Sequence, residues 1–289
     1  VQEVSKSNIF TCVHKHYSVE DWKKFRDNIV DYSIYNYFSV SCGIKDDDIL
    51  KLHEIMIELP KINFICLDVA NGYTERFMSF VEKMRQHEAT KNSIIIAGNV
   101  CTPETTEQII LAGADIVKIG IGPGSVCTTR KMTGVGFPQL SATMECADAA
   151  HGLGGHIITD GGCTVVGDIA KSFGAGADFV MLGGMLAGHN ECMGEKVGNH
   201  RGAKMKFYGM SSDDAQLEYY GEKKEHRASE GKTVYVDYRG PVKNTIQEIL
   251  GGLRSACTYA GAKTLKDLPK CTTFVRVNRQ LNEIFSSNS

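Results

Sequence analysis

The chain has 289 residues, of which 42% are apolar, enough for one large core of the size that a single α/β barrel uses. Its 32 basic and 34 acidic side chains nearly balance, which argues against a nucleic-acid-binding protein and against a protein held on a membrane by charge. No run is long enough to span a bilayer, and the ten cysteines are scattered without a Cys-x-x-Cys pair. We therefore expect a soluble, cytoplasmic protein with reduced thiols.

Short apolar β-branched runs recur along the chain, and each is followed by a helical pattern, which is the sequence form of repeated βα units. The runs are nearly continuous in apolar character, as expected of parallel strands that are covered on both faces. Seven runs are found: Phe10–His14, Tyr37–Ser41, Asn63–Asp68, Ser93–Gly98, Asp115–Ile119, His156–Asp160 and Asp178–Leu182. They predict a (β/α)8 TIM barrel over residues 1–289. Because the chain reaches its first run almost at once, we expect the first barrel strand to be missing.

An internal repeat supports this architecture. Ala112-Gly-Ala-Asp-Ile-Val117 returns 63 residues later as Ala175-Gly-Ala-Asp-Phe-Val180, an offset that fits two βα units. Between the runs, Pro103–Leu111 has the signals of a helix, with Thr102 as the N-cap, Pro103 at the first helical position and Gly113 as terminator.

Polar residues follow the early strands, at the end where barrel active sites assemble. They include His14-Lys15-His16 after the first run and Asp68-Val69-Ala70-Asn71-Gly72 after the third. Two histidines two residues apart suggest a metal, but no third ligand recurs at metal spacing, so zinc is not expected there. No Gly-x-Gly-x-x-Gly lies between a strand and a helix, so a Rossmann dinucleotide site is not indicated either.

The segment Gly120-Ile-Gly-Pro-Gly-Ser-Val-Cys-Thr-Thr-Arg130 follows the fifth run. Its three glycines and one proline force an irregular backbone that can present a side chain and direct carbonyls toward an ion. Cys127 stands among hydroxyl groups and before Arg130, a polar setting that favours a reactive thiolate. We therefore take Cys127 as the candidate nucleophile and the other nine cysteines as structural.

Two glycine pairs follow the next strands, Asp160-Gly161-Gly162 and Leu182-Gly183-Gly184. Either pair alone could simply make a tight turn. Together they occupy the loops that cradle a phosphate in many barrels, where backbone amides approach the oxygens closely. Asp160 would repel phosphate, so its carboxylate is better matched to a ribose diol, and a nucleotide is the expected ligand.

Residues 188–240 are rich in Gly, Lys, Glu and Tyr and predict a long excursion over one end of the barrel, although composition alone also allows a disordered surface loop. A β-like run lies at Thr233–Tyr238, and Lys243–Tyr259 then shows helical spacing. Glu230 within this segment could act in catalysis or be an ordinary solvated carboxylate.

These motifs resemble the IMP dehydrogenase and GMP reductase group over essentially the whole chain. The resemblance rests on Gly122-x-Gly-Ser-x-Cys-x-Thr-Arg130, Leu67-Asp-Val-Ala-Asn-Gly72, Asp160-Gly-Gly162, Met181-Leu-Gly-Gly184 and Gly209-Met-Ser211. Arg227-Ala-Ser-Glu-Gly-Lys232 and the unbroken passage from Cys12–His14 into the next helix are similar to the reductase branch. The resemblance implies NADPH-dependent conversion of GMP to IMP and ammonia, through a covalent bond between Cys127 and purine C2.

The resemblance also implies roles for individual residues. Cys127, Thr129 and Glu230 are the implied catalytic residues, with the last two managing the proton of the leaving ammonia. The implied substrate-binding residues are Asp160, Gly161, Gly162, Gly183, Gly184, Gly209, Met210, Ser211, Arg227, Ala228, Ser229, Glu230 and Gly231. The implied cofactor residues are Lys15, Asp68, Val69, Ala70, Ile121, Gly122, Met210, His226, Arg227, Ser255, Ala256, Cys257 and Thr258. The last four would reach a cofactor within the chain or across a subunit boundary.

A monovalent cation, usually potassium in this group, is implied at Gly122, Gly124 and Cys127 with Arg130 nearby, and a homotetramer is the implied assembly. Two alternatives stay open at this point. One is the dehydrogenase reaction, from IMP to XMP with NAD. The other is a GMP sensor without catalysis, which would keep the phosphate loops but need neither Cys127 nor Glu230.

Overall fold

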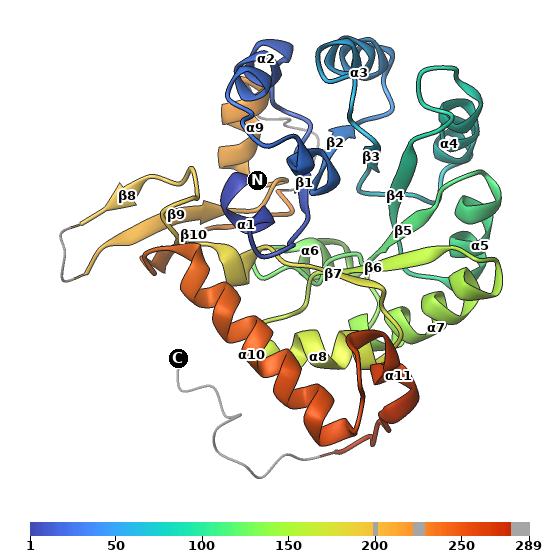
Figure 1. The fold of residues 1–289 in the computed structure, drawn as a ribbon, viewed down its shortest axis with the longest axis vertical. Coiled ribbons are helices and arrows are strands. Elements are labelled where there is room, and N and C mark those ends of the chain that lie inside the picture. Colours follow the sequence, from blue (N-terminus) through green and yellow to red (C-terminus); the bar gives the residue numbers. More distant parts are fainter. Residues whose placement is uncertain (199–201, 222–228, 279–289) are drawn as a thin grey trace.

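The seven expected runs form one parallel sheet in the computed structural model of the chain, which describes residues 1–198, 202–221 and 229–278. The sheet curls around an axis with helices on its outside (Figure 1). Its strands are adjacent in chain order: β1 (Thr11–Val13), β2 (Phe38–Cys42), β3 (Phe64–Asp68), β4 (Ile94–Val100), β5 (Ile116–Ile119), β6 (His156–Asp160) and β7 (Phe179–Met181). The predicted βα order is therefore confirmed.

The helices lie outside the sheet and at its two ends (Figure 1). Their bounds are α1 (Gln2–Ser5), α2 (Val19–Asp27), α3 (Asp46–Glu58), α4 (Glu75–Gln86), α5 (Pro103–Leu111), α6 (Thr129–Thr133), α7 (Gln139–Gly152), α8 (Val166–Gly174), α9 (Asp213–Tyr220), α10 (Val242–Ala260) and α11 (Leu268–Cys271), with short 3-10 turns at Tyr32–Asn36, Gly184–Leu186 and Leu265–Asp267. In the part of the chain that the structure describes, no helix combines the length and apolar character needed to cross a membrane.

Helix α5 has the predicted bounds, and Thr102 is its N-cap residue as predicted, although its side chain makes no capping hydrogen bond. The Thr102 hydroxyl instead donates to Thr105 Oγ1 at 3.2 Å. Pro103 at the first helical position removes one of the donors that would need such a cap.

The strands are buried on both faces, which explains why their sequences are continuously apolar. Ile95 on β4 points outward and belongs to the large core between sheet and helices, together with Phe38 and Phe77. Its neighbour Ile96 points inward and packs with Ile158 inside the curled sheet. Successive residues of one strand thus serve two different cores.

The curled sheet is open between its first and last strands. Within the described residues, β1 and β7 do not pair with each other, and a groove of about 1600 Å³ lies between them. Apolar side chains line it, including those of Phe10, Ile96 and Phe179. This is the arrangement of a (β/α)8 barrel that lacks one strand, so the prediction of a missing strand is confirmed.

The excursion between β7 and α10 is folded where the structure describes it. Strands β8 (Lys196–Val197), β9 (Lys204–Tyr208) and β10 (Thr233–Asp237) form an antiparallel sheet in the order β10-β9-β8, and α9 lies between β9 and β10 in the chain. Figure 1 shows this small sheet beside the main one. The described part of the excursion is therefore not a disordered surface loop.

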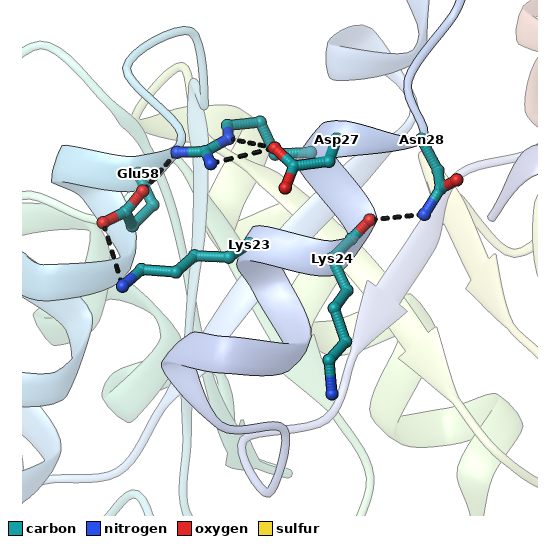
Figure 2. Close-up of polar contacts among 6 residues, drawn as sticks. Lys23, Lys24, Asp27, Asn28 and Glu58 are labelled. Atoms are coloured by element: carbon teal, nitrogen blue, oxygen red, sulfur yellow. Dashed lines mark hydrogen bonds and ion pairs between the residues drawn. The ribbon is translucent and has the colours of Figure 1, made fainter.

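Charged contacts join α2 to α3 on the outside of the sheet (Figure 2). Lys23 Nζ lies 3.6 Å from Glu58 Oε1, and the Arg26 guanidinium contacts both Glu58 and Asp27. Asn28 Nδ2 donates to the Lys24 carbonyl at 2.7 Å, at the end of α2. Solvated pairs of this kind contribute about 0–1 kcal/mol each, so they help to orient the two helices and contribute little to the stability of the core.

Candidate active site

The loop after β5 is held in its irregular shape by Arg130 and by glycine. Arg130 donates from Nε to the Ile121 carbonyl at 3.2 Å and from Nη2 to the Phe137 carbonyl at 2.6 Å. Gly122 has φ of 79°, and a Cβ there would lie 2.6 Å from Arg130 Cγ. A side chain at this position would therefore have an unfavourable backbone angle and would also collide with the aliphatic part of the Arg130 side chain.

Cys127, Thr129 and Glu230 form a chain of hydrogen bonds. The Cys127 thiol donates to Thr129 Oγ1 at 3.2 Å, and the Thr129 hydroxyl donates to Glu230 Oε2 at 2.7 Å. Thr129 is the first residue of α6, whereas Glu230 comes from the excursion, 101 residues further along. A thiol and a carboxylate joined by one hydroxyl can pass a proton to a group that reacts at the sulfur.

The segment with Glu230 is docked on the loop through its backbone. Thr128 N donates to the Glu230 carbonyl and Lys232 N donates to the Val126 carbonyl, both at 2.9 Å. Cys127 and Gly231 pair as an isolated antiparallel bridge. A Cβ on Gly231 would lie 2.8 Å from Ser212 N, so only glycine fits where this segment passes the backbone of Ser212. The position of the Glu230 carboxylate thus depends on main-chain contacts.

The segment Gly209-Met210-Ser211 completes this side of the site. Gly209 N donates to the Lys232 carbonyl at 3.2 Å, and a Cβ on Gly209 would approach the Val126 carbonyl to 3.2 Å. Met210 is 49% exposed, and Ser211 is exposed as well. Ser229 also lies here, because its carbonyl accepts the Thr128 hydroxyl at 3.3 Å. The excursion therefore brings several of the predicted substrate residues beside Cys127.

The two glycine pairs lie on the other side of the loop. Gly161 and Gly162 both have φ of 87°, and a Cβ on Gly161 would lie 3.0 Å from Pro123 Cγ. A Cβ on Gly184 would collide with the Ser125 hydroxyl, whereas one on Gly183 would meet nothing within 4 Å. Three of these glycines are thus needed for close packing or for a left-handed backbone. Gly183 instead borders open space, where a ligand could approach its backbone.

A buried lysine lies beneath the predicted ribose and cofactor residues. Lys118 on β5 is 4% exposed, contacts the Asp68 carboxylate and lies 3.9 Å from Asp160 Oδ2. Burial alone would lower the pKa of Lys118, but the attraction of these carboxylates outweighs it and raises that pKa well above its usual value. Asn99 Nδ2 donates to Asp160 Oδ2 at 2.8 Å.

Lys118 and Asn99 were not predicted as site residues. The signal in the sequence was a lysine in the apolar run Ile116-Val117-Lys118-Ile119, since lysine is almost never fully buried without a partner. Together with Asn99, it fixes the orientation of the Asp68 and Asp160 carboxylates, so both are positioning residues.

An aromatic cluster lies at the end of β1. The rings of His16 and Tyr219 stack with centroids 4.1 Å apart, and those of His14 and Tyr17 stack at 4.5 Å. Burial, together with the neighbouring cations, lowers the pKa of His16 to about 4, so this ring is neutral near pH 7. Lys15 between the two histidines donates to the Asp68 carbonyl at 3.3 Å. The structure thus brings two of the predicted cofactor residues together.

The remaining predicted cofactor residues lie in three places. Val69 and Ala70 directly follow Asp68, with Val69 N donating to the Gly98 carbonyl at 2.9 Å, and Ile121 and Gly122 belong to the loop itself. The four residues Ser255, Ala256, Cys257 and Thr258 are in the last part of α10, and Figure 1 shows this end of the helix well apart from α6. Within one chain they are not brought to Cys127. His226, Arg227 and Ala228 lie outside the described residues.

The carbonyl oxygens of the predicted cation ligands differ in whether they already accept a hydrogen bond. The Gly124 carbonyl accepts the Cys127 amide and the Arg130 carbonyl accepts the Gly134 amide, both at 3.0 Å. Among residues 1–198, 202–221 and 229–278, no hydrogen-bond donor reaches the carbonyls of Gly122 or Cys127. These two oxygens therefore fit a cation best, whereas Arg130 serves mainly to clamp the loop.

Comparison with known proteins adds independent findings. Residues 8–283 match the family described as IMP dehydrogenase / GMP reductase domain. GMP reductase of Caenorhabditis elegans is 56% identical over 283 residues, which are 98% of this chain and 78% of that protein. GMP reductase of Phytophthora infestans is 57% identical over 283 residues, 98% of this chain and 77% of that one.

Among solved structures, a cysteine-to-alanine variant of GMP reductase from Trypanosoma brucei, in complex with guanosine 5'-monophosphate, is similar with a TM-score of 0.78 and 36% identity. The match covers 83% of this chain and 50% of that one, so the chain spans half the length of this solved relative.

Proposed function

The chain belongs to the IMP dehydrogenase / GMP reductase family, and from that membership we propose that it catalyses the NADPH-dependent reductive deamination of GMP to IMP and ammonia. Relatives named GMP reductase match nearly the whole chain, which favours the reductase over the dehydrogenase reaction. The observation that carries the proposal is the hydrogen-bonded chain from the Cys127 thiol through Thr129 to Glu230, because it joins a nucleophile to a proton source.

GMP is held, in this proposal, between the two sides of the catalytic loop. Its phosphate lies on the backbone amides of Gly161, Gly162, Gly183 and Gly184, and the open space beside Gly183 supports this placement. The ribose hydroxyls donate to Asp160, whose carboxylate Asn99 orients. The base then extends toward Cys127 and the excursion segments 209–211 and 229–231.

The reaction begins with attack of the Cys127 sulfur on purine C2, which forms a carbon–sulfur bond. The 2-amino group leaves as ammonia, and Thr129 with Glu230 supplies the proton that makes it a viable leaving group. A nicotinamide cofactor held beside Lys15 and Asp68 would supply the hydride for C2, and loss of the Cys127 sulfur from that carbon would then release IMP. The sulfur leaves as a thiolate. Because the original thiol proton has passed through Thr129 and Glu230 to the ammonia, the thiolate takes up one proton from solvent through the same pair, and each turnover consumes one proton.

The cofactor is placed on the side of Lys15 and Asp68. The residues present fit a nicotinamide nucleotide, since Lys15 offers a positive charge beside neutral, stacked aromatic rings at the end of β1. Met210 and Ile121 would complete this side, and residues 255–258 would come from a neighbouring copy in a homotetramer; the expected residues His226 and Arg227 lie outside the described residues. Potassium would be held by the free carbonyls of Gly122 and Cys127, where it would stabilise the shape of the loop.

The test is loss of NADPH absorbance when the protein meets GMP, with IMP and ammonia measured as products. A Cys127→Ala variant should bind GMP but consume no NADPH. Binding of GMP by the parent protein without NADPH oxidation would instead indicate a sensor, and reduction of NAD with IMP would indicate the dehydrogenase. Either result would overturn the proposal.

A further inference from the structure

Two histidines and an aspartate meet at the end of the sheet opposite the catalytic loop. His151 lies near the end of α7, His156 is the first residue of β6, and Asp178 directly precedes β7. His151 Nε2 is 2.9 Å from Asp178 Oδ2, and His156 Nδ1 is 3.1 Å from Asp178 Oδ1. The three ligand atoms lie within 4.8 Å of one another. This cluster comes from the starts of two parallel strands, whereas the catalytic residues follow strand ends.

The internal repeat shows which part of this cluster is structural. Asp115 and Asp178 occupy equivalent repeat positions, and each accepts a backbone N–H from the preceding strand, Ile95 N at 2.7 Å and Ile157 N at 2.9 Å. The first aspartate is paired with Arg85, at 2.6 Å. The second has two imidazoles in place of one guanidinium. The hydrogen bond from the Ile157 amide therefore explains why an aspartate stands at position 178, but it does not require two histidines beside it.

The presence of two imidazoles beside Asp178, where Asp115 has a guanidinium, matters for metal binding. Arginine does not bind a metal, whereas neutral imidazole is the commonest protein ligand of transition metals. In a tetrahedral site, metal–ligand bonds of about 2.0–2.2 Å place neighbouring ligand atoms about 3.3–3.6 Å apart, so the two nitrogen–oxygen pairs, now 2.9 Å and 3.1 Å apart, need to separate by less than about 1 Å. The spacing His151-x4-His156 is also one that zinc sites use. Both imidazoles are about half exposed, at 44% and 54%, so an ion can reach them from solvent.

From this geometry we propose that His151, His156 and Asp178 bind a divalent transition-metal ion of the zinc class. The ion takes the place of the two imidazole N–H donors, so each histidine shifts its proton to its other ring nitrogen and no net proton is lost from a neutral ring. Three protein ligands leave the remaining coordination positions to water. The bound ion ties the end of α7 to the start of β7, which is the strand at the open edge of the sheet.

The site is tested by titrating the full chain, freed of metal by a chelator, with Co²⁺ and recording its visible absorption. We expect one Co²⁺ per chain with d–d bands and without thiolate-to-cobalt charge transfer, displaced by Zn²⁺. The absence of charge transfer matters because the chain has ten cysteines. The double variant His151→Gln/His156→Gln should bind Co²⁺ at least about tenfold more weakly, since it loses two imidazole ligands.

A matched control removes two imidazoles elsewhere. His53 and His87 stack with centroids 4.5 Å apart, so His53→Gln/His87→Gln should keep the affinity of the parent chain for Co²⁺. Circular dichroism of the metal-free proteins checks that each variant is folded, and Asp178→Asn, which still accepts the Ile157 amide, provides a second variant that should lose binding. No uptake by the parent chain, binding through thiolates, or equal affinity in the His151/His156 variant would overturn the site. None of these results would bear on GMP turnover, because the proposal is independent of that function.

Discussion

Replacing Glu230 by glutamine should separate two steps of the proposed reaction. The Glu230 carboxylate accepts the Thr129 hydroxyl at 2.7 Å, and Thr129 in turn accepts the Cys127 thiol at 3.2 Å. Glutamine keeps the shape of the side chain but cannot deliver an acidic proton through Thr129. The segment should stay docked, because the main-chain bonds from Thr128 to Glu230 and from Lys232 to Val126 do not use the side chain.

The expected magnitude follows from the loss of a positioned general acid, about 10²–10⁴-fold in rate. This corresponds to about 3–5 kcal/mol in the barrier for ammonia release. Hydride exchange between IMP and NADP+ involves no ammonia, so its rate in Glu230→Gln should change by much less. Glutamine Oε1 can still accept the Thr129 hydroxyl, so only the charge of this hydrogen bond is lost, and stability should fall by about 1 kcal/mol.

Both rates are measured on the same preparation, GMP conversion by NADPH oxidation and exchange by transfer of isotopic hydrogen. Glu195→Gln is the matched control, because this exposed carboxylate lies in the excursion and acts on Lys206 rather than on Thr129, while its backbone carbonyl accepts Lys206 N at 3.0 Å. It should leave both rates unchanged. If Glu230→Gln slowed the two half-reactions equally, the residue would only support the loop, and the proton-relay argument would be refuted.

Three further predictions concern binding and stability. Lys118→Met should destabilise the chain by about 1–3 kcal/mol in urea unfolding, less than for a fully buried pair because the Asp68 side chain is 44% exposed; an unchanged midpoint would contradict this. Gly183→Ala should weaken GMP binding without changing the unfolding temperature, because its Cβ meets open space; Gly152→Ala, equally uncrowded but on α7, should leave GMP affinity unchanged. The lowered pKa of His16 means that the unfolded chain binds its proton more readily. The contribution of neutral His16 to the free energy of unfolding is therefore present above about pH 6.5 and is lost as the pH falls toward about 4. In His16→Gln, the urea midpoint should fall less steeply over this pH range than in the parent chain.

The sequence by itself determined the order of strands and helices and the loop that carries Cys127. Continuous apolar runs indicate strands buried on two faces, and this pattern is local, so Ile94–Val100 and Pro103–Leu111 could be predicted from the residues within them. The irregular shape of the loop could also be predicted, because glycine at Gly122 reports a backbone angle that other residues avoid. Seven runs likewise indicated a sheet with one strand missing.

Tertiary structure alone decided which distant side chains meet. The carboxylate of Glu230 reaches Thr129 across 101 residues because the excursion docks on the loop through its backbone, and the spacing of Glu230 in the sequence carried no sign of that contact. Lys118 was not predicted as a site residue, because only the curl of the sheet places two carboxylates beside it. His151, His156 and Asp178 meet only because neighbouring parallel strands start at the same end of the sheet. Local patterns encode burial and backbone angles, whereas contacts between charged groups depend on the three-dimensional packing of whole elements.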